Sequence, residues 1–575
     1  MWGSVILCFI SLIIVAFTHY VYRWRNPKCN GILPPGSMGF PLIGQTIQFF
    51  ASNNSLDVPY FFRKRFARYG TMFRTSLAGH PIVVSSDPDF NYFIFQQERK
   101  SVELWYMDSF SAIFGGGLEY ATDAQIHKYF RNAALNHFGT EALKERLLPK
   151  IERMSNQALE SWSNQPSIEL KSSITSMIFD LTSKHLFDYD STKSTENLSE
   201  MFASFFQGLM TFPVNIPGTA FHRCMQNQKK AMKLMKDILH KRRNSPEVPQ
   251  RGDFLDQVLE DMKKENFLTD DFVIYVIFGL LLASFATISA IVTLAMTFLT
   301  DHPLVVKELL EEQEAILKDR ENVDSPLTWK ELKSMTLYVT GARNPLFTLY
   351  VITETLRMSS IAPGILRKAI KDIDINGYGI PKGWTIMVVT SAIHMNPDKY
   401  KYPFSFNPAR WNVSLKPAAA AAVEALSQLT HFAGNMDAAE RAMAAGVQGR
   451  HWNPNNELGV GGRGRGGGMY SQMPMPLQHA PYPVDFRDPS ANMSSKNFIS
   501  FGSGMRNCVG AEFSKTLMGI FLHVLVTKFT WTKIKGGNAF RTPSLSFGDG
   551  FHVKISKKRD GIKASTTSLE VDARN

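Results

Sequence analysis

The segment FISFGSGMRNCVGAEFSK, from Phe498 to Lys515, decides the fold class of this chain of 575 residues. It places Cys508 in a glycine-rich turn, and a segment with the apolar spacing of an amphipathic helix follows directly. The chain has only three other cysteines, which are Cys8, Cys29 and Cys224. They lie far apart and form no CxxC pair, which argues against a disulfide framework and against structural zinc. The turn around Cys508 therefore needs an explanation of its own.

The turn has the form F-x-x-G-x-R-x-C-x-G, with Phe501, Gly504, Arg506, Cys508 and Gly510 at its fixed positions. Each position has a use if the Cys508 thiolate is the axial ligand of a haem iron. Glycines allow a tight turn whose backbone N–H groups point at the sulfur, and the following helix N-terminus favours the ionised thiol. Arg506 would pair with a haem propionate, Phe501 would shield the sulfur, and Gly510 would let the helix approach the porphyrin. A thiolate ligand favours O–O cleavage. The alternative is an inert small thiol in a turn.

A second motif predicts a buried ionic lock that supports this turn. Glu354 and Arg357, in ITETLR, are three residues apart and share one face of a helix. Arg410 follows in P-x-x-F-x-P-x-R-W. Two arginines around one carboxylate can form a satisfied buried group whose role is structural.

The N-terminal segment predicts a membrane anchor. Residues 1–22 are almost continuously apolar, and Arg23, Arg25 and Lys28 follow at once. Because the positive charge comes after the apolar run, the segment is expected to remain as an anchor with the body in the cytosol. A cleaved signal peptide or a buried N-terminal helix is the alternative. Residues 23–44, basic and rich in proline and glycine, are expected to form a stiff hinge.

The formal net charge of +12 favours an anionic membrane surface or an acidic protein partner. Nucleic acid is the weakest of the three readings of this charge and is not expected as a partner.

The spacing of apolar residues predicts a mainly α fold with small β-sheets. Helical spacing covers 141–161, 173–187, 226–243 and 303–318, whereas 71–90 alternates like a strand pair and 542–557 is predicted as a hairpin. Residues 272–300 carry no charge, so this stretch is either a long core helix or a second transmembrane helix. Its scattered serines and threonines favour the core helix.

Two stretches interrupt this pattern. The letters TLYV begin at Thr336 and again at Thr348, as though a dozen residues, about 337–348, had been inserted. This insert comes directly before the helix of Glu354, whose start it could displace. Residues 416–483 are biased to alanine, glycine, methionine and proline, as in a disordered segment. A functional loop and an error in gene prediction both explain the second stretch.

Taken in order, these motifs resemble those of the cytochromes P-450, membrane-anchored haem-thiolate monooxygenases. Segments such as NGILPPGSMGFPLIGQTIQFF and HKYFRNAALNHFG are similar to the plant clan that oxidises steroids and triterpenoids, including brassinosteroid and cucurbitane oxidases. The resemblance implies a catalytic domain over 45–558 and a polar tail over 559–575. It also implies haem, electrons from NADPH through a separate reductase, a lipophilic substrate, and a single-pass location in the endoplasmic reticulum membrane with the body facing the cytosol.

The resemblance assigns residues as well as a fold. Cys508 matches the iron ligand and Arg506 a propionate-binding arginine. His127 and Arg131, in HKYFR, match the family's other propionate pair, and Arg367, in PGILRK, is a further expected propionate contact. An ordinary surface cation is the alternative for each of these basic residues. The aromatic stretch 102–114 is expected to line the mouth of the substrate pocket, or to be plain core packing.

The long uncharged helix lacks the acid of the family's motif. The family's A-G-x-(D/E)-T is here ASFAT, so Thr287 matches the threonine that steadies bound dioxygen, while Ala286 replaces the acid. A methyl group cannot relay protons, and a positioned acid or base contributes roughly 10²–10⁴-fold. Water, Ser284 or Ser289 is expected to offset part of this loss. Two alternatives follow: a haem-thiolate enzyme that rearranges peroxides, or a catalytically impaired product of a decayed or mis-predicted gene.

Overall fold

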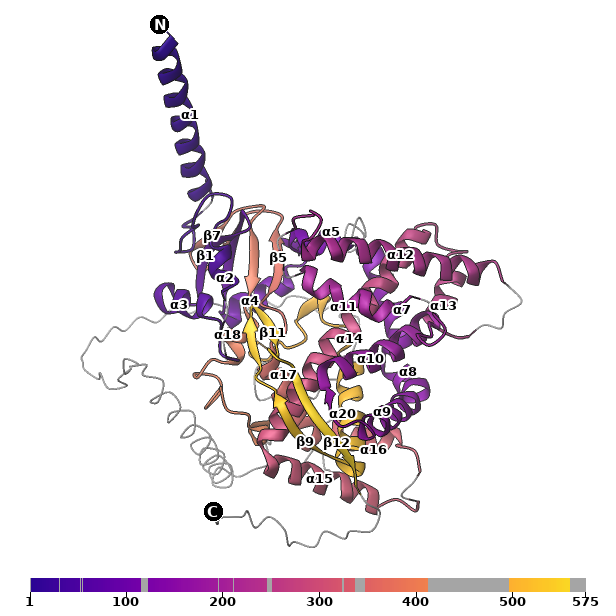
Figure 1. Cartoon of the computed structure of the whole chain (residues 1–575). Helices are drawn as coiled ribbons and strands as arrows, with labels where there is room; N and C mark the ends of the chain where they lie inside the picture. The colour runs from indigo at the N-terminus through magenta and orange to yellow at the C-terminus, as the bar shows by residue number, and fades with distance from the viewer. Residues whose placement is uncertain are drawn as a thin grey trace, which may run out of the picture.

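The structure is a computed structural model, and the residues it describes are 2–29, 31–51, 53, 55–114, 123–194, 196–209, 211, 213–245, 251–322, 325–336, 347–411 and 496–558. The predicted insert at 416–483 and the tail at 559–575 lie outside these residues, as do positions 337–346 of the shorter insert. The predicted mainly α architecture with small sheets is confirmed (Figure 1).

The helices differ widely in length. They are α1 (Trp2–Arg25), α2 (Thr46–Phe49), α3 (Tyr60–Tyr69), α4 (Pro88–Gln96), α5 (Asp108–Phe114), α7 (Ala124–Phe138), α8 (Thr140–Ala142), the π-helix η1 (Leu143–Leu147), α9 (Leu148–Ser163), α10 (Leu170–Phe187), α11 (Leu198–Leu209), α12 (Ala220–Arg243), α13 (Phe254–Asp261), α14 (Asp270–Asp301), α15 (Pro303–Lys318), α16 (Trp329–Thr336), α17 (Phe347–Ser359), α18 (Thr390–His394), the 3-10 helices η2 (Pro408–Trp411) and η4 (Gly504–Arg506), and α20 (Ala511–Lys528).

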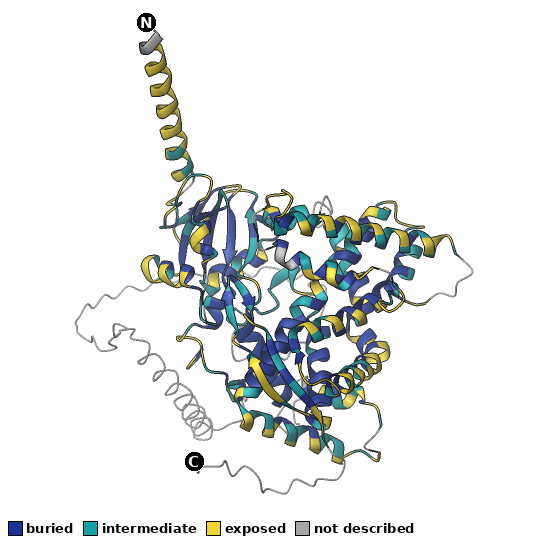
Figure 2. Ribbon diagram, in the orientation of Figure 1, coloured by how far each residue is buried: buried dark blue, intermediate teal, exposed yellow. Residues whose placement is uncertain are grey.

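The largest sheet lies beside α1. Its strands, in spatial order, are β1 (Met72–Leu77), β2 (His80–Ser85), β8 (Thr385–Val388), β5 (Ile365–Ala369) and β3 (Val102–Leu104). Only β2 and β8 run parallel; the other neighbours are antiparallel. Short bridges join Gly36 to Arg74 and Gly44 to Leu77, so part of the predicted hinge lies against β1. The helix α1 projects away from this sheet, exposed from Val5 to Tyr20 (Figures 1 and 2).

The predicted hairpin at 542–557 is wrong. The strand β11 (Ser544–Ser546) pairs with β10 (Phe540–Thr542), whereas β12 (Phe551–Lys557) pairs with β9 (Phe529–Gly536) and β4 (Ile168–Glu169). A fourth sheet consists of β6 (Ile373–Ile375) and β7 (Tyr378–Ile380). Gly548 and Gly550 have positive φ angles of 49° and 80°, and the Gly550 carbonyl accepts a hydrogen bond from Gly537 N–H at 2.9 Å. This turn therefore leads the chain from β11 into β12, which lies beside β9.

The helix α14 forms the centre of the helical part. Thr269 caps it by accepting a hydrogen bond from Phe272 N–H at 3.3 Å, and two aspartates in the first turn favour the positive helix end. Although α1 and α14 are both long and apolar enough to span a membrane, α14 is mostly buried within the body. It packs against α10, α12 and α17 (Figure 2). This packing supports the core helix expected for residues 272–300.

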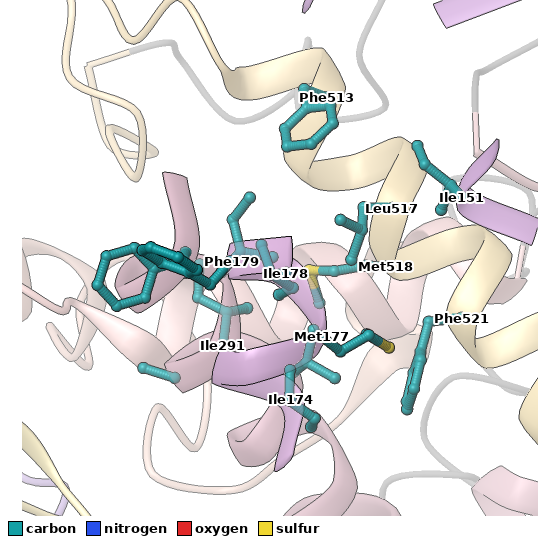
Figure 3. Packing of buried hydrophobic residues seen from close by; sticks show 14 of the residues in the cluster. Ile151, Ile174, Met177, Ile178, Phe179, Ile291, Phe513, Leu517, Met518 and Phe521 are labelled. Atoms are coloured by element: carbon teal, nitrogen blue, oxygen red, sulfur yellow. The ribbon is translucent and has the colours of Figure 1, made fainter. Parts of the chain in front are cut away.

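The core continues from α14 to α20. Ile291 of α14 lies beside Ile178 and Phe179 of α10, and Leu517 and Met518 of α20 complete the same cluster (Figure 3). Other side chains of this packed region include Ile151, Ile174, Met177, Phe513 and Phe521. The helix that follows Cys508 is therefore held by the core along its length.

The helix that carries Glu354 starts at Phe347, directly after the shorter insert. The Glu312 carboxylate of α15 accepts hydrogen bonds from the N–H groups of Phe347 and Thr348, at 2.7 and 2.9 Å. Gln313 donates to the Thr348 hydroxyl at 2.7 Å, and its carbonyl lies 2.7 Å from His523 Nδ1 of α20. The first turn of α17 is therefore fixed to α15 and α20, so the second TLYV copy is part of a regular buried helix.

Candidate active site

Cys508 lies between η4 and the N-terminus of α20. Its N–H donates to the Phe501 carbonyl at 2.9 Å, which closes the turn. The side chain is exposed, yet protein on several sides raises the pKa of the thiol by burial, while a Gly510 N–H and the charge of Arg131 act in the opposite direction. The thiol is thus open to solvent and yet surrounded by protein on several sides, which indicates that it faces a recess. Two groups that favour the thiolate lie beside it.

Gly504 is required by the close approach of a second segment. Its φ is +69°, and a Cβ added there would lie 2.4 Å from the carbonyl oxygen of Phe95, at the end of α4. Gly510 differs, because its φ of −88° suits any residue and a Cβ would meet only Cys508 Sγ, at 3.9 Å. The missing side chain at Gly510 therefore leaves open space beside the sulfur.

Basic side chains gather next to the cysteine turn. Arg131 Nη1 of α7 donates to the Asn507 carbonyl at 2.7 Å. Burial, together with the charges of Arg506, Arg99 and Arg131, lowers the pKa of His127, one turn earlier, to about 4. His127 is therefore neutral at pH 7 and lies within the field of three arginines. The structure thus brings together His127, Arg131 and Arg506.

A buried carboxylate joins Arg506 to Arg367. Arg506 Nε donates to Glu98 Oε1 at 2.9 Å, and Arg367 Nε lies 2.8 Å from Glu98 Oε2. The Arg367 N–H is not directed at that oxygen, so this second contact is an ion pair without an aligned hydrogen bond. Glu98 and Arg99 were missed by sequence reasoning. They lie in a short turn after α4 that carries no motif.

The three residues of the predicted lock form one buried group. Arg357 donates twice to Glu354, from Nε at 2.9 Å and from Nη2 at 2.8 Å, and Arg410 Nε donates at 2.9 Å. Trp411 Nε1 and the Asn407 N–H add hydrogen bonds at 3.0 Å each. Although burial raises the pKa of Glu354, the two arginines and these donors bring it below its usual value. The carboxylate is therefore ionised and fully satisfied.

His394 connects the lock to the cysteine turn. Arg357 Nη1 donates to the His394 carbonyl at 2.8 Å, while His394 Nε2 accepts from the Ile499 N–H at 3.1 Å. The imidazole must be neutral at Nε2 to accept this bond. Burial holds the pKa of His394 at about 3, and the charge of Arg357 contributes to this lowering. Sequence reasoning missed His394 because it belongs to none of the motifs.

One face of α14 remains open along the middle of this buried helix. Ala283 is exposed, and Tyr275, Gly279 and Thr287, at four-residue spacing, are half-buried. The Thr287 hydroxyl donates to the Ala283 carbonyl at 2.7 Å. Ala286 is half-buried beside it.

The two serines near Thr287 differ in position. Ser284 is half-buried and its hydroxyl donates to the Leu281 carbonyl at 2.9 Å. Ser289 is fully buried and donates to the Ala286 carbonyl at 3.1 Å. The expected compensation by Ser289 is therefore wrong, because its hydroxyl lies in the core.

Stacked aromatic rings connect the basic cluster to α14. Tyr106 stacks on Phe110 with ring centroids 4.3 Å apart, and Phe110 stacks on Phe114 at 4.5 Å. Phe114 meets Phe278 of α14 edge to face at 5.5 Å. Burial raises the pKa of Tyr106, whose hydroxyl also experiences the charges of Arg367, Arg506 and Glu98. The stretch 102–114 therefore runs from the arginines to α14.

A separate surface groove of about 570 Å³ lies between α9 and α10. Its lining includes Gln157, Ser173 and Asp180, none of which belongs to the motifs described above. A smaller apolar gap is lined by Tyr129 and Phe272, among others.

These residues fit a haem. Arg506 and Arg367 share the carboxylate of Glu98, whereas Arg99 and Arg131 donate to the backbone carbonyls of Asp123 and Asn507. Among the described residues, these contacts leave positive charge in excess, which suits the two propionates of a haem. Arg99 Nε and Arg367 Nε are buried without a hydrogen-bond partner, which matches donors suited to an anionic group. The accessible Cys508 thiol and the open space beside Gly510 complete the fit.

Comparison with known proteins gives the same assignment. The family model for cytochrome P-450 matches residues 34–420 and 482–554. The chain is 39% identical over 559 residues to the cucurbitadienol 11-hydroxylase of Siraitia grosvenorii, covering 97% of this chain and 100% of the relative. It is 38% identical over 551 residues to the beta-amyrin 16-alpha-hydroxylase CYP87D16 of Maesa lanceolata, covering 96% and 98%.

Solved structures agree on the fold. The retinoic acid bound cyanobacterial CYP120A1 is similar with a TM-score of 0.69 at 22% identity, over 92% of this chain and 100% of that chain. The chain therefore belongs to the cytochrome P-450 family, whose members are haem-thiolate monooxygenases supplied with electrons from NADPH through a reductase.

Proposed function

We propose that this chain hydroxylates a polycyclic lipid of the triterpenoid or steroid class. The observation that carries the proposal is the similarity, over nearly the whole chain, to two relatives named as triterpenoid hydroxylases. The stacked rings of Tyr106, Phe110 and Phe114 support it, because aromatic side chains offer the apolar contact area that a fused-ring skeleton requires.

In this proposal Cys508 is the axial ligand of the haem, and the bound haem supplies the activation of dioxygen. The Gly510 N–H and the charge of Arg131 favour the thiolate form of Cys508. Arg506, Arg131 and Arg367 hold the propionates. Neutral His127 donates or accepts a hydrogen bond there, and Phe501 packs over the turn.

The open face of α14 would supply the residues that handle dioxygen and protons. The Thr287 hydroxyl can exchange its hydrogen bond to Ala283 for one to a water molecule, which would hold a proton source in place. Ala286 offers no titratable group, so proton delivery relies on water and on Ser284.

The location and the redox partner belong to the proposal as well. The exposed apolar helix α1 would anchor the chain in the endoplasmic reticulum membrane, and the arginines at its end would remain in the cytosol. The net charge of +12 suits an acidic docking face on an NADPH-dependent reductase.

Expression of the full chain with a plant reductase in yeast microsomes tests the function. With NADPH and dioxygen, cucurbitadienol or β-amyrin should gain one hydroxyl group, detected by mass spectrometry. A chain carrying Cys508→Ser is the matched control and should give no product. The opposite result would favour peroxide rearrangement: a lipid hydroperoxide is converted without NADPH, and neither cucurbitadienol nor β-amyrin is converted with NADPH. Both relatives are named as hydroxylases, which favours the first outcome.

A further inference from the structure

We propose that Glu98 is a positioning residue at the haem edge, where its carboxylate sets the placement and the net charge of Arg506 and Arg367. The inference rests on the proposed haem site. It assigns a role to a residue outside the cysteine turn, outside the lock and outside α14.

The contacts of Glu98 are those of a built site. Its side chain is 2% exposed, and those of Arg506 and Arg367 are 7% and 4% exposed. One carboxylate oxygen accepts from Arg506 Nε at 2.9 Å, and the other lies 2.8 Å from Arg367 Nε. Glu98 therefore bridges the cysteine turn, which carries Arg506, to the strand β5, which carries Arg367.

The backbone around Glu98 is fixed against the same turn. The N–H groups of Lys100 and Ser101 donate to the Gln97 carbonyl at 2.9 and 3.0 Å, which closes a tight turn directly after α4. One turn of helix earlier, the Phe95 carbonyl lies against Gly504. The segment thus contacts the cysteine turn twice, once through backbone and once through the carboxylate. A group held on rigid elements in this way can orient its partners.

Charge gives Glu98 its second effect. Burial and the charge of Arg506 both lower the pKa of Arg367, whereas the charge of Glu98 raises it. Two buried guanidinium groups repel each other, and a carboxylate between them removes most of that cost. Without it the haem edge would carry one more positive charge. A more positive field favours the reduced iron, so the reduction potential would rise.

The test compares Glu98→Gln with Glu98→Asp in the full-length enzyme purified from membranes. The Gln variant keeps the shape and loses the charge, whereas the Asp variant keeps the charge. Glu311→Gln, on α15, is the matched control because the Glu311 side chain is 63% exposed and its ion-pair partner is Lys307 of the same helix. For each protein the haem content and the reduction potential are measured.

We expect Glu98→Gln to lose haem several-fold and to shift the reduction potential upward. Glu98→Asp should keep the potential of the parent, and Glu311→Gln should change neither value. A Glu98→Gln protein with the haem content and potential of the parent would overturn the inference. If the Gln variant binds no haem, Glu98→Asp decides: recovered haem supports the role of charge, and no haem refutes it. A parent chain without a thiolate-type spectrum would refute the proposed function itself, independently of every Glu98 variant.

Discussion

Replacement of Gly504 by alanine tests how the cysteine turn is held. The added methyl group would lie 2.4 Å from the Phe95 carbonyl oxygen, far inside the normal contact distance. The backbone of η4 fixes the position of the added Cβ, and the backbone at the end of α4 fixes the Phe95 carbonyl oxygen. Neither atom can therefore rotate away. The overlap can be relieved only if the turn and α4 separate, which would also displace Arg506 and its contact with Glu98.

Gly502→Ala is the matched control for this prediction. Gly502 has a φ of +76°, close to the +69° of Gly504. A Cβ added at Gly502 would have the flexible side-chain atom Ile365 Cδ1 as its nearest neighbour, at 3.9 Å. Placing alanine in this left-handed region costs roughly 1–2 kcal/mol. Both variants bear this cost, and only Gly504→Ala adds the overlap with Phe95.

The assay is the reduced carbon-monoxide spectrum per amount of full-length protein, together with thermal unfolding. We expect Gly502→Ala to retain most of the thiolate-type signal with a modest loss of stability. Gly504→Ala should lose at least about twice as much stability, or roughly 2–4 kcal/mol, and most of the signal. Equal effects of the two substitutions would refute the close approach of Phe95 as the reason for the glycine.

Three further predictions concern the lock around Glu354, the neighbouring His394, and Ala286 of α14. Glu354→Gln should lower the free energy of unfolding by about 3–5 kcal/mol, because it leaves buried arginine charge uncompensated, and should abolish haem-loaded protein. The surface control Glu311→Gln should lower it by less than about 0.5 kcal/mol. Denaturant unfolding measures both values. Because the pKa of His394 is held at about 3 when folded, only the unfolded chain takes up its proton below pH 6.5. Stability should therefore fall by about 1.4 kcal/mol for each pH unit below 6.5 on this account, and a pH series with His394→Gln should lack that component; an unchanged slope would contradict it. Ala286→Asp should raise the ratio of product formed to NADPH consumed, and an unchanged ratio would argue against a missing relay at this position.

The cysteine turn and the lock could be predicted because each motif residue has a fixed spacing and a single chemical use. Glu354, Arg357 and Arg410 need each other as charges, and the structure brings them together with the Trp411 and Asn407 donors. The long helix α14 was predictable from its lack of charge, and its serines and threonines favoured the core position that it occupies.

Contacts between distant segments could not be predicted in this way. Glu98 lies 408 positions before Arg506, and its turn has neither periodicity nor a motif. The cap that Glu312 provides for α17 likewise joins two helices whose sequences show no sign of the contact. The pattern at 542–557 predicted a local hairpin, but its second strand, β12, pairs with β9 and β4 instead of with β11. Local patterns predicted the elements, whereas the pairing of distant segments depends on packing.

The most direct test of the account is the reduced carbon-monoxide difference spectrum of the full chain in microsomes, beside that of Cys508→Ser. The account predicts a thiolate-type Soret band for the parent and its complete loss in the variant, with the variant still present in the membrane fraction. A thiolate-type band that persists in Cys508→Ser, or no band in the well-folded parent, would contradict the assignment of Cys508 as the haem ligand.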